Sequence, residues 1–347
     1  MRQVKSRAQG AGEALSVHPM TTLIALWHLS RPRLLPYVLC LVIVGMAWGH
    51  WDRALTLRGM EGLGWVLLAW WALHAGTLWL NAALDQDEGE VLYGRAVRPP
   101  KHVALVGYAA LLLTVGLAVA AGSVAGGCAL GCALLSVLYS HPKTQWKGHP
   151  IGGPLVNGLG YGLLSPMAGW SLVGVSATPR TVAAWGLGLA GVLSCYFMAQ
   201  AFQEAEDADR GYRTLVVTHG PDGALFAARL CLAVAFAGGM LLAAVGWFPR
   251  ICLLGAPLWW WVDRWLLHWH QEGGGERRAR VFAGRILLSL LVMLTLVFSD
   301  YAWESYAGQP VAGLGTAAGH PPDRPLLPPR QMRLWEHQNG REFLTDD

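Results

Sequence analysis

Long apolar runs separated by short charged connections are the feature that most constrains what this chain can fold into. Only 14% of its 347 residues are charged and 54% are hydrophobic, whereas soluble domains carry about 25% charged residues. In lipid, a spanning segment must satisfy its own backbone hydrogen bonds, so it is a helix or part of a closed barrel. The runs are continuous and do not alternate at period two. The sequence therefore predicts an all-α, polytopic membrane helical bundle.

Nine runs approach the length of about twenty residues that a membrane-spanning helix needs. The eighth is the weakest, because Asp263 and Arg264 interrupt it. The nine expected spans lie near residues 34–51, 63–83, 102–120, 122–139, 152–174, 181–201, 223–246, 251–268 and 281–300. The chain also has eighteen tryptophans. Interfacial belts usually need fewer, so we expect some of these tryptophans to line a cavity.

The connections predict the orientation and the limits of the membrane domain. With the N-terminus inside, sixteen Lys and Arg residues fall on the cytoplasmic side and four on the other side. Because cytoplasmic loops carry the excess of positive charge, we expect a multi-pass protein of the inner (cytoplasmic) membrane with a cytoplasmic N-terminus. Residues 1–24 form a basic N-terminal segment, 25–303 the membrane domain, and 304–347 a flexible tail rich in Pro and Gly.

Two of the expected helices end in acidic clusters on the cytoplasmic side. Asp85, Asp87 and Glu88 follow the second span, and Glu206 and Asp207 follow the sixth. The two short segments hold eight of the twenty-two acidic residues of the chain. Mg²⁺ takes one or two carboxylates together with phosphate oxygens. The paired clusters are therefore suited to Mg²⁺ and a phosphorylated ligand.

Polar side chains lead from mid-membrane toward both acidic clusters. At 3.6 residues per turn, one stripe on the second span consists of His74, Thr77, Asn81, Asp85 and Glu88. A second stripe, on the sixth span, consists of Tyr196, Gln200, Gln203 and Asp207. Polar groups at this depth normally face a bundle interior or a cavity. We expect both stripes to face the same site.

The connection after the fourth span is basic. Lys143 and Lys147 are four residues apart, so a helical turn would present both ammonium groups to a phosphate. Asn157 and Tyr161 follow, near the start of the fifth span. Both lysines also satisfy the positive-inside rule without any ligand, so a purely topological role stays open.

Taken together, these pieces resemble the UbiA-type intramembrane prenyltransferases over roughly residues 25–300. The parts that match the family's motifs are, in order, Leu29-Ser30-Arg31-Pro32 before the first helix, Asn81 and Asp85, Arg98-Pro99, Tyr139-Ser140 with Pro142 and Lys147, Asn157 with Tyr161-Gly162, and Asp207, Gly211, Thr214 and Leu215. Three positions depart from the pattern. Ala82, Gly89 and Gln203 stand where the family usually has aspartates.

The resemblance implies a function and a set of site residues. The family transfers an isoprenyl group from a prenyl diphosphate to an acceptor, here an aromatic or other lipophilic molecule, with Mg²⁺ and release of diphosphate. The implied catalytic residues are Asn81, Asp85 and Asp207, and the implied metal ligands are Asp85, Asp87, Glu88, Gln203, Glu206 and Asp207. The implied diphosphate-binding residues are Arg98, Lys143, Lys147, Asn157 and Arg213. The implied lining of the prenyl and cation cavity is His74, Trp79, Tyr139, Tyr161, Tyr196 and Gln200.

Two other interpretations stay open. A terpene cyclase of the same superfamily would ionise the same diphosphate without a separate acceptor. A transporter would use the polar stripes as an ion path, although the acids gather at one membrane face. The expected partners are an isoprenyl diphosphate, a lipophilic acceptor and membrane lipid. The formal net charge of +4 is too small to indicate nucleic acid, and nothing in the sequence points to an obligate protein partner.

Overall fold

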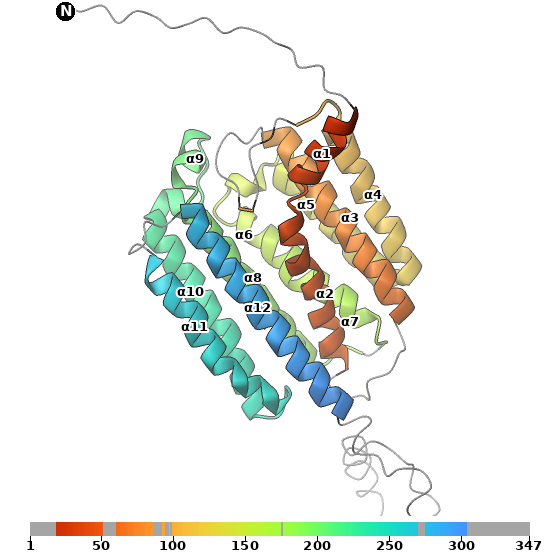
Figure 1. The fold of residues 1–347 in the computed structure, drawn as a ribbon, viewed down its shortest axis with the longest axis vertical. Helices are drawn as coiled ribbons and strands as arrows, with labels where there is room; N and C mark the ends of the chain where they lie inside the picture. Colours follow the sequence, from red (N-terminus) through yellow and green to blue (C-terminus); the bar gives the residue numbers. More distant parts are fainter. Residues whose placement is uncertain are drawn as a thin grey trace, which may run out of the picture.

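The chain folds into helices in the computed structural model, which describes residues 19–50, 60–85, 92–93, 97, 99–174, 176–269 and 275–303 (Figure 1). The longer helices are α1 (Pro19–Leu29), α2 (Leu35–Gly49), α3 (Met60–Asp85), α4 (Val103–Ala121), α5 (Ser123–Ser140), α8 (Pro179–Gln200), α10 (Leu215–Ala244), α11 (Gly255–Leu267) and α12 (Gly275–Ala302). The shorter elements are η1 (Pro32–Leu34), η2 (Trp146–Gly148), α6 (Gly152–Asn157), η3 (Gly158–Leu164), α7 (Ser165–Ser171), α9 (Glu204–Asp209) and η4 (Arg250–Leu254). The described part contains no strand.

The predicted polytopic all-α bundle is confirmed. Within the described residues, seven helices are long and apolar enough to cross a membrane, namely Thr22–Gly49, Met60–Leu84, Val103–Ala121, Ser123–Ser140, Pro179–Gln200, Leu215–Ala244 and Gly275–Ala302. The other two expected spans are helical as well. The fifth is divided into α6, η3 and α7, and the eighth is α11, which has only 13 residues. The predicted N-terminal segment overlaps this bundle, since α1 begins at Pro19.

The helices form two packed groups that each have their own core. One core gathers side chains of α3, α4 and α5 with α2, including Val42, Trp70 and Leu111. The other gathers side chains of α8, α10, α11 and α12, including Leu232 and Phe282. Figure 1 shows α10, α11 and α12 at one side of the bundle and α3 and α4 at the other side, with α9 and the start of α12 at the same end as α1.

Glycines let α2 and α7 approach each other backbone to backbone. A Cβ atom added at Gly45 would lie 1.7 Å from the carbonyl oxygen of Pro166, and one added at Gly169 would lie 1.9 Å from that of Val42. No side chain fits in such gaps. Small residues are the usual means by which membrane helices pack this closely.

The fifth span changes helix type because of its sequence. Pro166 has no N–H group, so it cannot bond the carbonyl of the residue four positions earlier. The seven residues Gly158–Leu164, which end two residues before Pro166 and include Gly160 and Gly162, form the π-helix η3. The Ser165 hydroxyl donates to the Gly160 carbonyl oxygen at 2.8 Å, which helps to satisfy the loosened backbone. Such π segments occur often at functional sites, and η3 carries Tyr161.

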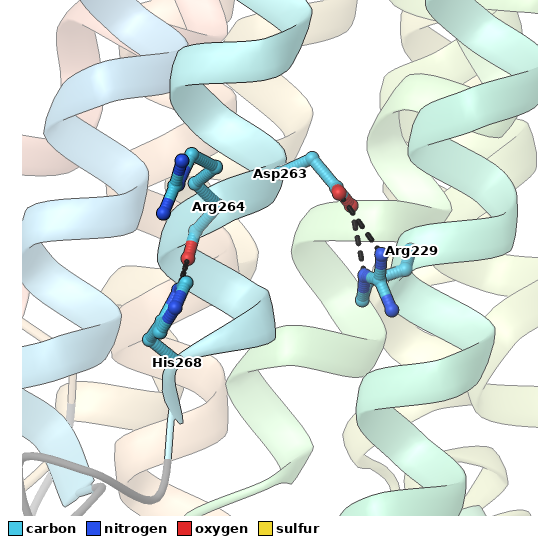
Figure 2. Close-up of polar contacts among 4 residues, drawn as sticks. All are labelled: Arg229, Asp263, Arg264 and His268. Carbon is cyan, nitrogen blue, oxygen red and sulfur yellow. Dashed lines mark hydrogen bonds and ion pairs between the residues drawn. The ribbon is translucent and has the colours of Figure 1, made fainter.

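Figure 2 shows how Asp263 and Arg264, which interrupt the eighth span, are accommodated. Arg229 of α10 donates two hydrogen bonds to the Asp263 carboxylate, at 2.8 and 2.9 Å. Arg264 points away from Asp263, and its guanidinium carbon lies 5.1 Å from the ring centre of Trp260. The His268 ring donates from Nδ1 to the Arg264 carbonyl oxygen at 2.7 Å. Asp263 and Arg264 therefore both have partners, which allows the short helix α11 to carry two charged side chains.

Arg278 of α12 caps the C-terminus of α11. Its guanidinium carbon lies 3.7 Å from the ring centre of Trp265, and its Nη2 atom donates to the carbonyl oxygens of His268 at 2.5 Å and Trp265 at 3.4 Å. The last carbonyls of a helix have no partner within the helix, and an arginine there also interacts favourably with the helix dipole.

Replacing Arg278 by Gln is expected to destabilise the protein by about 1.5–3 kcal/mol, the usual range for a hydrogen bond to a charged group. The side chain is only 3% exposed, so water cannot replace it. Arg277→Gln is the matched control, because Arg277 is exposed on the same helix and should change stability by no more than about 0.5 kcal/mol. Thermal unfolding of the detergent-solubilised variants measures both effects, and equal midpoints for the two would contradict the capping role.

Candidate functional site

A cavity of about 840 Å³ lies between the two groups of helices. Its wall is formed by side chains of α2, α3, α8, α10 and α12, together with η3 and α9. Pockets for small ligands usually measure about 300–1,000 Å³, so this one is large. Trp48, Trp170 and Trp247 belong to the lining, which confirms that some tryptophans line a cavity. Most of the lining is apolar. The charged side chains gather at the end beside α9, apart from Arg180 in the first turn of α8.

Asp207 is the buried carboxylate at that end. It lies in α9, is 9% exposed and lines the cavity. The Thr214 hydroxyl donates to its Oδ2 atom at 2.8 Å. Burial raises the pKa of Asp207 above its usual value, while the bond from Thr214 and the charges of Arg210 and Lys147 oppose that rise. A carboxylate in such a place is stabilised by any cation that enters the cavity.

The backbone around α9 explains why Asp207 faces the cavity. Tyr212 N donates to the Asp207 carbonyl oxygen at 2.9 Å, and the chain reverses at Gly211, whose φ of 70° favours glycine. Arg213 N then donates to the Gly148 carbonyl oxygen at 2.9 Å. This bond ties the connection between α9 and α10 to η2, which carries Lys147.

Lys147 is the buried cation at the same end. It is 7% exposed and lines the cavity, and its Nζ atom lies 5.7 Å from the ring centre of Tyr212. Burial, and then the charge of Arg210, lower the pKa of Lys147 to about 8, while Asp207 opposes the shift. Lys143, its predicted companion, is exposed and lies outside the cavity lining. The structure therefore separates two lysines that the sequence could not tell apart.

Asn81 is the part of the first acidic motif that the structure places in the cavity wall. The Ser140 hydroxyl donates to its Oδ1 atom at 3.1 Å, so α5 fixes the amide. One turn earlier, the hydroxyls of Thr77 and Ser136 are hydrogen-bonded at 2.8 Å. Asp85 is the last residue of α3. The side chain of Asp85 and the residues Asp87, Glu88 and Arg98 lie outside the described part of the chain.

Aromatic and amide side chains cover the wall next to the polar end. Of the residues that the sequence assigned to this part of the site, the cavity is lined by His74, Tyr139, Asn157, Tyr161, Tyr196 and Gln200. The Gln200 amide donates to the Tyr196 hydroxyl at 2.9 Å, and Gly153 makes room for that hydroxyl, which would lie 2.1 Å from an added Cβ. Trp79 is not in the lining. Its indole N–H instead donates to the Leu26 carbonyl oxygen at 2.8 Å and ties α3 to α1.

Three of the predicted metal ligands, Gln203, Glu206 and Asp207, line the cavity together. The Glu206 carboxylate also accepts a hydrogen bond from Arg210 at 2.7 Å. Within the residues that the structure describes, no three side chains of His, Cys, Asp or Glu come together as a ready metal site. Arg213, predicted to bind diphosphate, is exposed and outside the lining.

Several cavity residues had no assigned role in the sequence. They include Arg31, Tyr37, Arg210 and Tyr212. Arg31 adopts a left-handed backbone conformation with φ of 45° between α1 and η1, which places it at the cavity although α1 itself packs elsewhere. Its only signal in the sequence is the Leu29-Ser30-Arg31-Pro32 stretch. Distant segments carry these residues, so only tertiary packing brings them together.

Comparisons with known proteins agree with this architecture. A UbiA homolog from Archaeoglobus fulgidus bound to GPP and Mg²⁺ is 19% identical, with a TM-score of 0.57 over 79% of this chain and 99% of that one. An apo UbiA homolog from Aeropyrum pernix K1 is 15% identical, with a TM-score of 0.53 over 78% and 96% of the two chains. The structure of a digeranylgeranylglyceryl phosphate synthase is 14% identical, with a TM-score of 0.53 over 81% and 99%. Because the sequence identities are this low, the comparisons with these solved structures show a shared fold and nothing more specific.

The family assignment comes from the sequence itself. The profile of the UbiA prenyltransferase family matches residues 34–291, about three quarters of the chain, whereas no curated protein sequence matches. The matched region begins at the last residue of η1 and ends inside α12, so it includes most of the cavity lining and residues of both helix groups. This chain is a multi-pass membrane protein that belongs to the UbiA prenyltransferase family.

Proposed function

We propose that this protein transfers an isoprenyl group from a prenyl diphosphate to an aromatic or other lipophilic acceptor, with Mg²⁺ and release of diphosphate. The observation that carries the proposal is one continuous cavity that joins the buried pair Asp207 and Lys147 to a long apolar chamber. A prenyl diphosphate has the same division into a charged head and an apolar chain. In support, UbiA homologs from Archaeoglobus fulgidus are bound to GPP and Mg²⁺ and to DMAPP and Mg²⁺.

The residues at the polar end fit Mg²⁺. Gln203, Glu206 and Asp207 present oxygen atoms, which a hard cation prefers, and burial raises the pKa of Asp207 in a way that a bound cation would offset. We assign Asp207 as the leading ligand on this wall, with Asp85, Asp87 and Glu88 on the other. When bound, Mg²⁺ would neutralise charge on the diphosphate oxygens. The six predicted ligands, three from each side, share a common mouth when the end of α3 delivers its acids there.

The chain's own cations complete the head-group site. Lys147 would neutralise negative charge on the departing diphosphate, with Arg31 as a second cation in the same lining. Asn81 and Asn157 would orient the diphosphate or its ligands by hydrogen bonds. The bond that breaks joins the allylic carbon to the bridging oxygen, and its electron pair leaves with the diphosphate. The acceptor then supplies the electron pair of the new carbon–carbon or carbon–heteroatom bond and loses a proton.

The aromatic wall suits the electron-poor prenyl group between these two events. Tyr139, Tyr161 and Tyr196 line the cavity next to the charged end, and an aromatic face attracts a cation by about 0.5–2 kcal/mol. The burial of this wall also keeps water away, which would otherwise capture the prenyl cation. We further propose that this end of the cavity faces the cytoplasm, because the excess of Lys and Arg lies at the ends of the helices that meet there.

Removal of Mg²⁺ is expected to stop the reaction. Purified protein incubated with prenyl diphosphates and candidate acceptors should release diphosphate and form a prenylated product, identified by mass spectrometry, and excess EDTA should lower the rate at least about 100-fold. Restoring Mg²⁺ should restore the rate. A hydrocarbon or alcohol product formed without any acceptor would instead support the cyclase interpretation, and passage of ions through proteoliposomes without any prenyl chemistry would support the transporter.

A further inference from the structure

The cavity follows α8 for nearly the whole length of that helix. Its lining includes Arg180 and Thr181 in the first turn of α8 and reaches Gln200, the last residue of that helix. Nineteen residues of α-helix correspond to about 28 Å at 1.5 Å per residue. The opposite wall has a similar extent, because α12 contributes lining residues from Ala283 to Tyr301, or about 27 Å.

The two ends of this chamber differ in chemistry. Gln200 lies at the end that holds Asp207 and Lys147. Toward the beginning of α8 the wall consists mainly of Trp48, Trp170 and Trp247, with Arg180 at the far end. Between the ends, α8 presents small side chains to the cavity, among them Ala184, Gly188 and Gly191. The spacing of four and three residues keeps these three on one face of the helix, which leaves an apolar groove.

We infer that this groove holds a long isoprenoid chain of about six isoprene units, laid along α8 with its diphosphate at Asp207 and Lys147. This inference rests on the proposed function and adds the length of the donor. An extended chain advances about 3.3–3.6 Å for every three backbone bonds, so an isoprene unit of four bonds covers about 4.6 Å. Roughly six such units fill the 28 Å between Gln200 and Thr181.

Gly191 marks a point partway along this groove. It is nine residues from Gln200, so it lies about 13.5 Å from the charged end, which corresponds to roughly three isoprene units. A Cβ atom added there would meet only the Cβ atom of Ala235, at an ordinary 3.8 Å, and Ala235 also lines the cavity. A larger side chain at Gly191 therefore occupies the groove without forcing the backbone to move.

Gly186 supplies a matched control on the same helix. It is exposed and absent from the cavity lining, and an added Cβ atom would meet nothing within 4 Å. The change from Gly to Leu is the same at both positions, and so is its effect on the helix propensity of α8. Only Gly191→Leu narrows the groove.

The test measures dissociation constants for prenyl diphosphates that increase in length by one isoprene unit, with Mg²⁺, on the full-length protein in detergent. In the wild type, affinity should rise about three- to tenfold per unit, because each unit buries further apolar surface, and should level off near six units. Gly191→Leu should follow the wild type up to about three units and gain nothing beyond. Gly186→Leu should follow the wild type at every length. Long ligands partition into detergent equally in all samples, so a difference between Gly191→Leu and Gly186→Leu does not come from that partition.

A second variant, Trp48→Ala, tests the same groove by enlarging it. The Trp48 ring reaches Gly188, since the ring atom Cη2 would lie 3.1 Å from an added Cβ there. Gly188 is twelve residues from Gln200, or about 18 Å and roughly four isoprene units. Trp48→Ala should therefore change the affinity for donors longer than about four units and leave that for shorter donors as in the wild type. The inference is overturned if wild-type affinity does not depend on chain length, or if Gly191→Leu matches the wild type throughout. If Gly191→Leu does not fold, the Trp48→Ala series decides. If no prenyl diphosphate of any length binds the wild type, the proposed function itself fails.

Discussion

Replacing Asp207 by Asn is expected to lower the rate of diphosphate release about 10³-fold at saturating Mg²⁺. The substitution keeps the shape of the side chain and its ability to accept the Thr214 hydroxyl, but it removes the negative charge that would hold the metal at the diphosphate. Losing one electrostatic contact to a developing charge in a buried site typically costs about 10²–10³-fold in rate. Asp207 is buried, and it is more buried than Glu206, the other acid in the described cavity lining.

Asp209→Asn is the control for this prediction. Asp209 lies two residues further along α9, is exposed, and does not line the cavity. The same chemical change there should leave the rate within about twofold of the wild type, because surface charges contribute little. Release of diphosphate from a radiolabelled prenyl diphosphate measures both variants, and thermal unfolding checks that both are folded. If the folded Asp207→Asn variant releases diphosphate at the wild-type rate, Asp207 does not bind the metal.

A loss of about 10²–10³-fold is also expected when Lys147 is replaced by Gln. Its ammonium group is buried, with a pKa lowered to about 8 by that burial and by Arg210, so it stands ready to bind an anion that brings compensating charge. A cation that meets charge developing on a leaving group in a dry site contributes far more than it would in water. The effect should appear in kcat, because the charge on the leaving oxygen is largest in the transition state.

Lys143→Gln separates this role from topology. Both lysines lie in the same connection and count equally toward the positive-inside rule, but Lys143 is exposed and outside the cavity lining. If the positive charge of this connection only orients the protein in the membrane, the two variants should behave alike. If Lys147 binds the diphosphate, Lys147→Gln should lose activity and Lys143→Gln should retain most of it. Equal losses would therefore contradict the assignment.

The membrane bundle is the part of this protein that the sequence determines by itself. Lipid offers the backbone no hydrogen-bond partners, so each long apolar run has to become a helix whatever its neighbours are. The expected spans match the helices even where the local structure is unusual. The fifth span breaks into α6, η3 and α7 at a glycine-rich stretch before Pro166, and the eighth is shortened, with its charges paired to Arg229 and stacked on Trp260.

The sequence also carries the family signal, because the motif residues keep their order and spacing along the chain. Asn81, Asp207 and Lys147 line one cavity, and their roles in binding metal and diphosphate stay predictions. The ligands Asp85, Asp87 and Glu88 and the predicted diphosphate contact Arg98 remain predictions, since the described residues do not include their side chains.

Tertiary structure alone decided which of several equivalent residues reach the cavity. Lys143 and Lys147, or Trp79 and Tyr139, look alike in a one-dimensional pattern, since helical periodicity gives a face and not the partner of that face. The bond from Arg213 N to the Gly148 carbonyl ties the turn that carries Lys147 to the connection before α10, and the bond from Trp79 to Leu26 holds that indole outside the cavity. Arg31 enters the site from a segment 176 residues before Asp207. The depth of the groove along α8 depends on where the six other elements of the cavity wall pack. Contacts between distant segments depend on the packing of whole helices, which no local sequence pattern specifies.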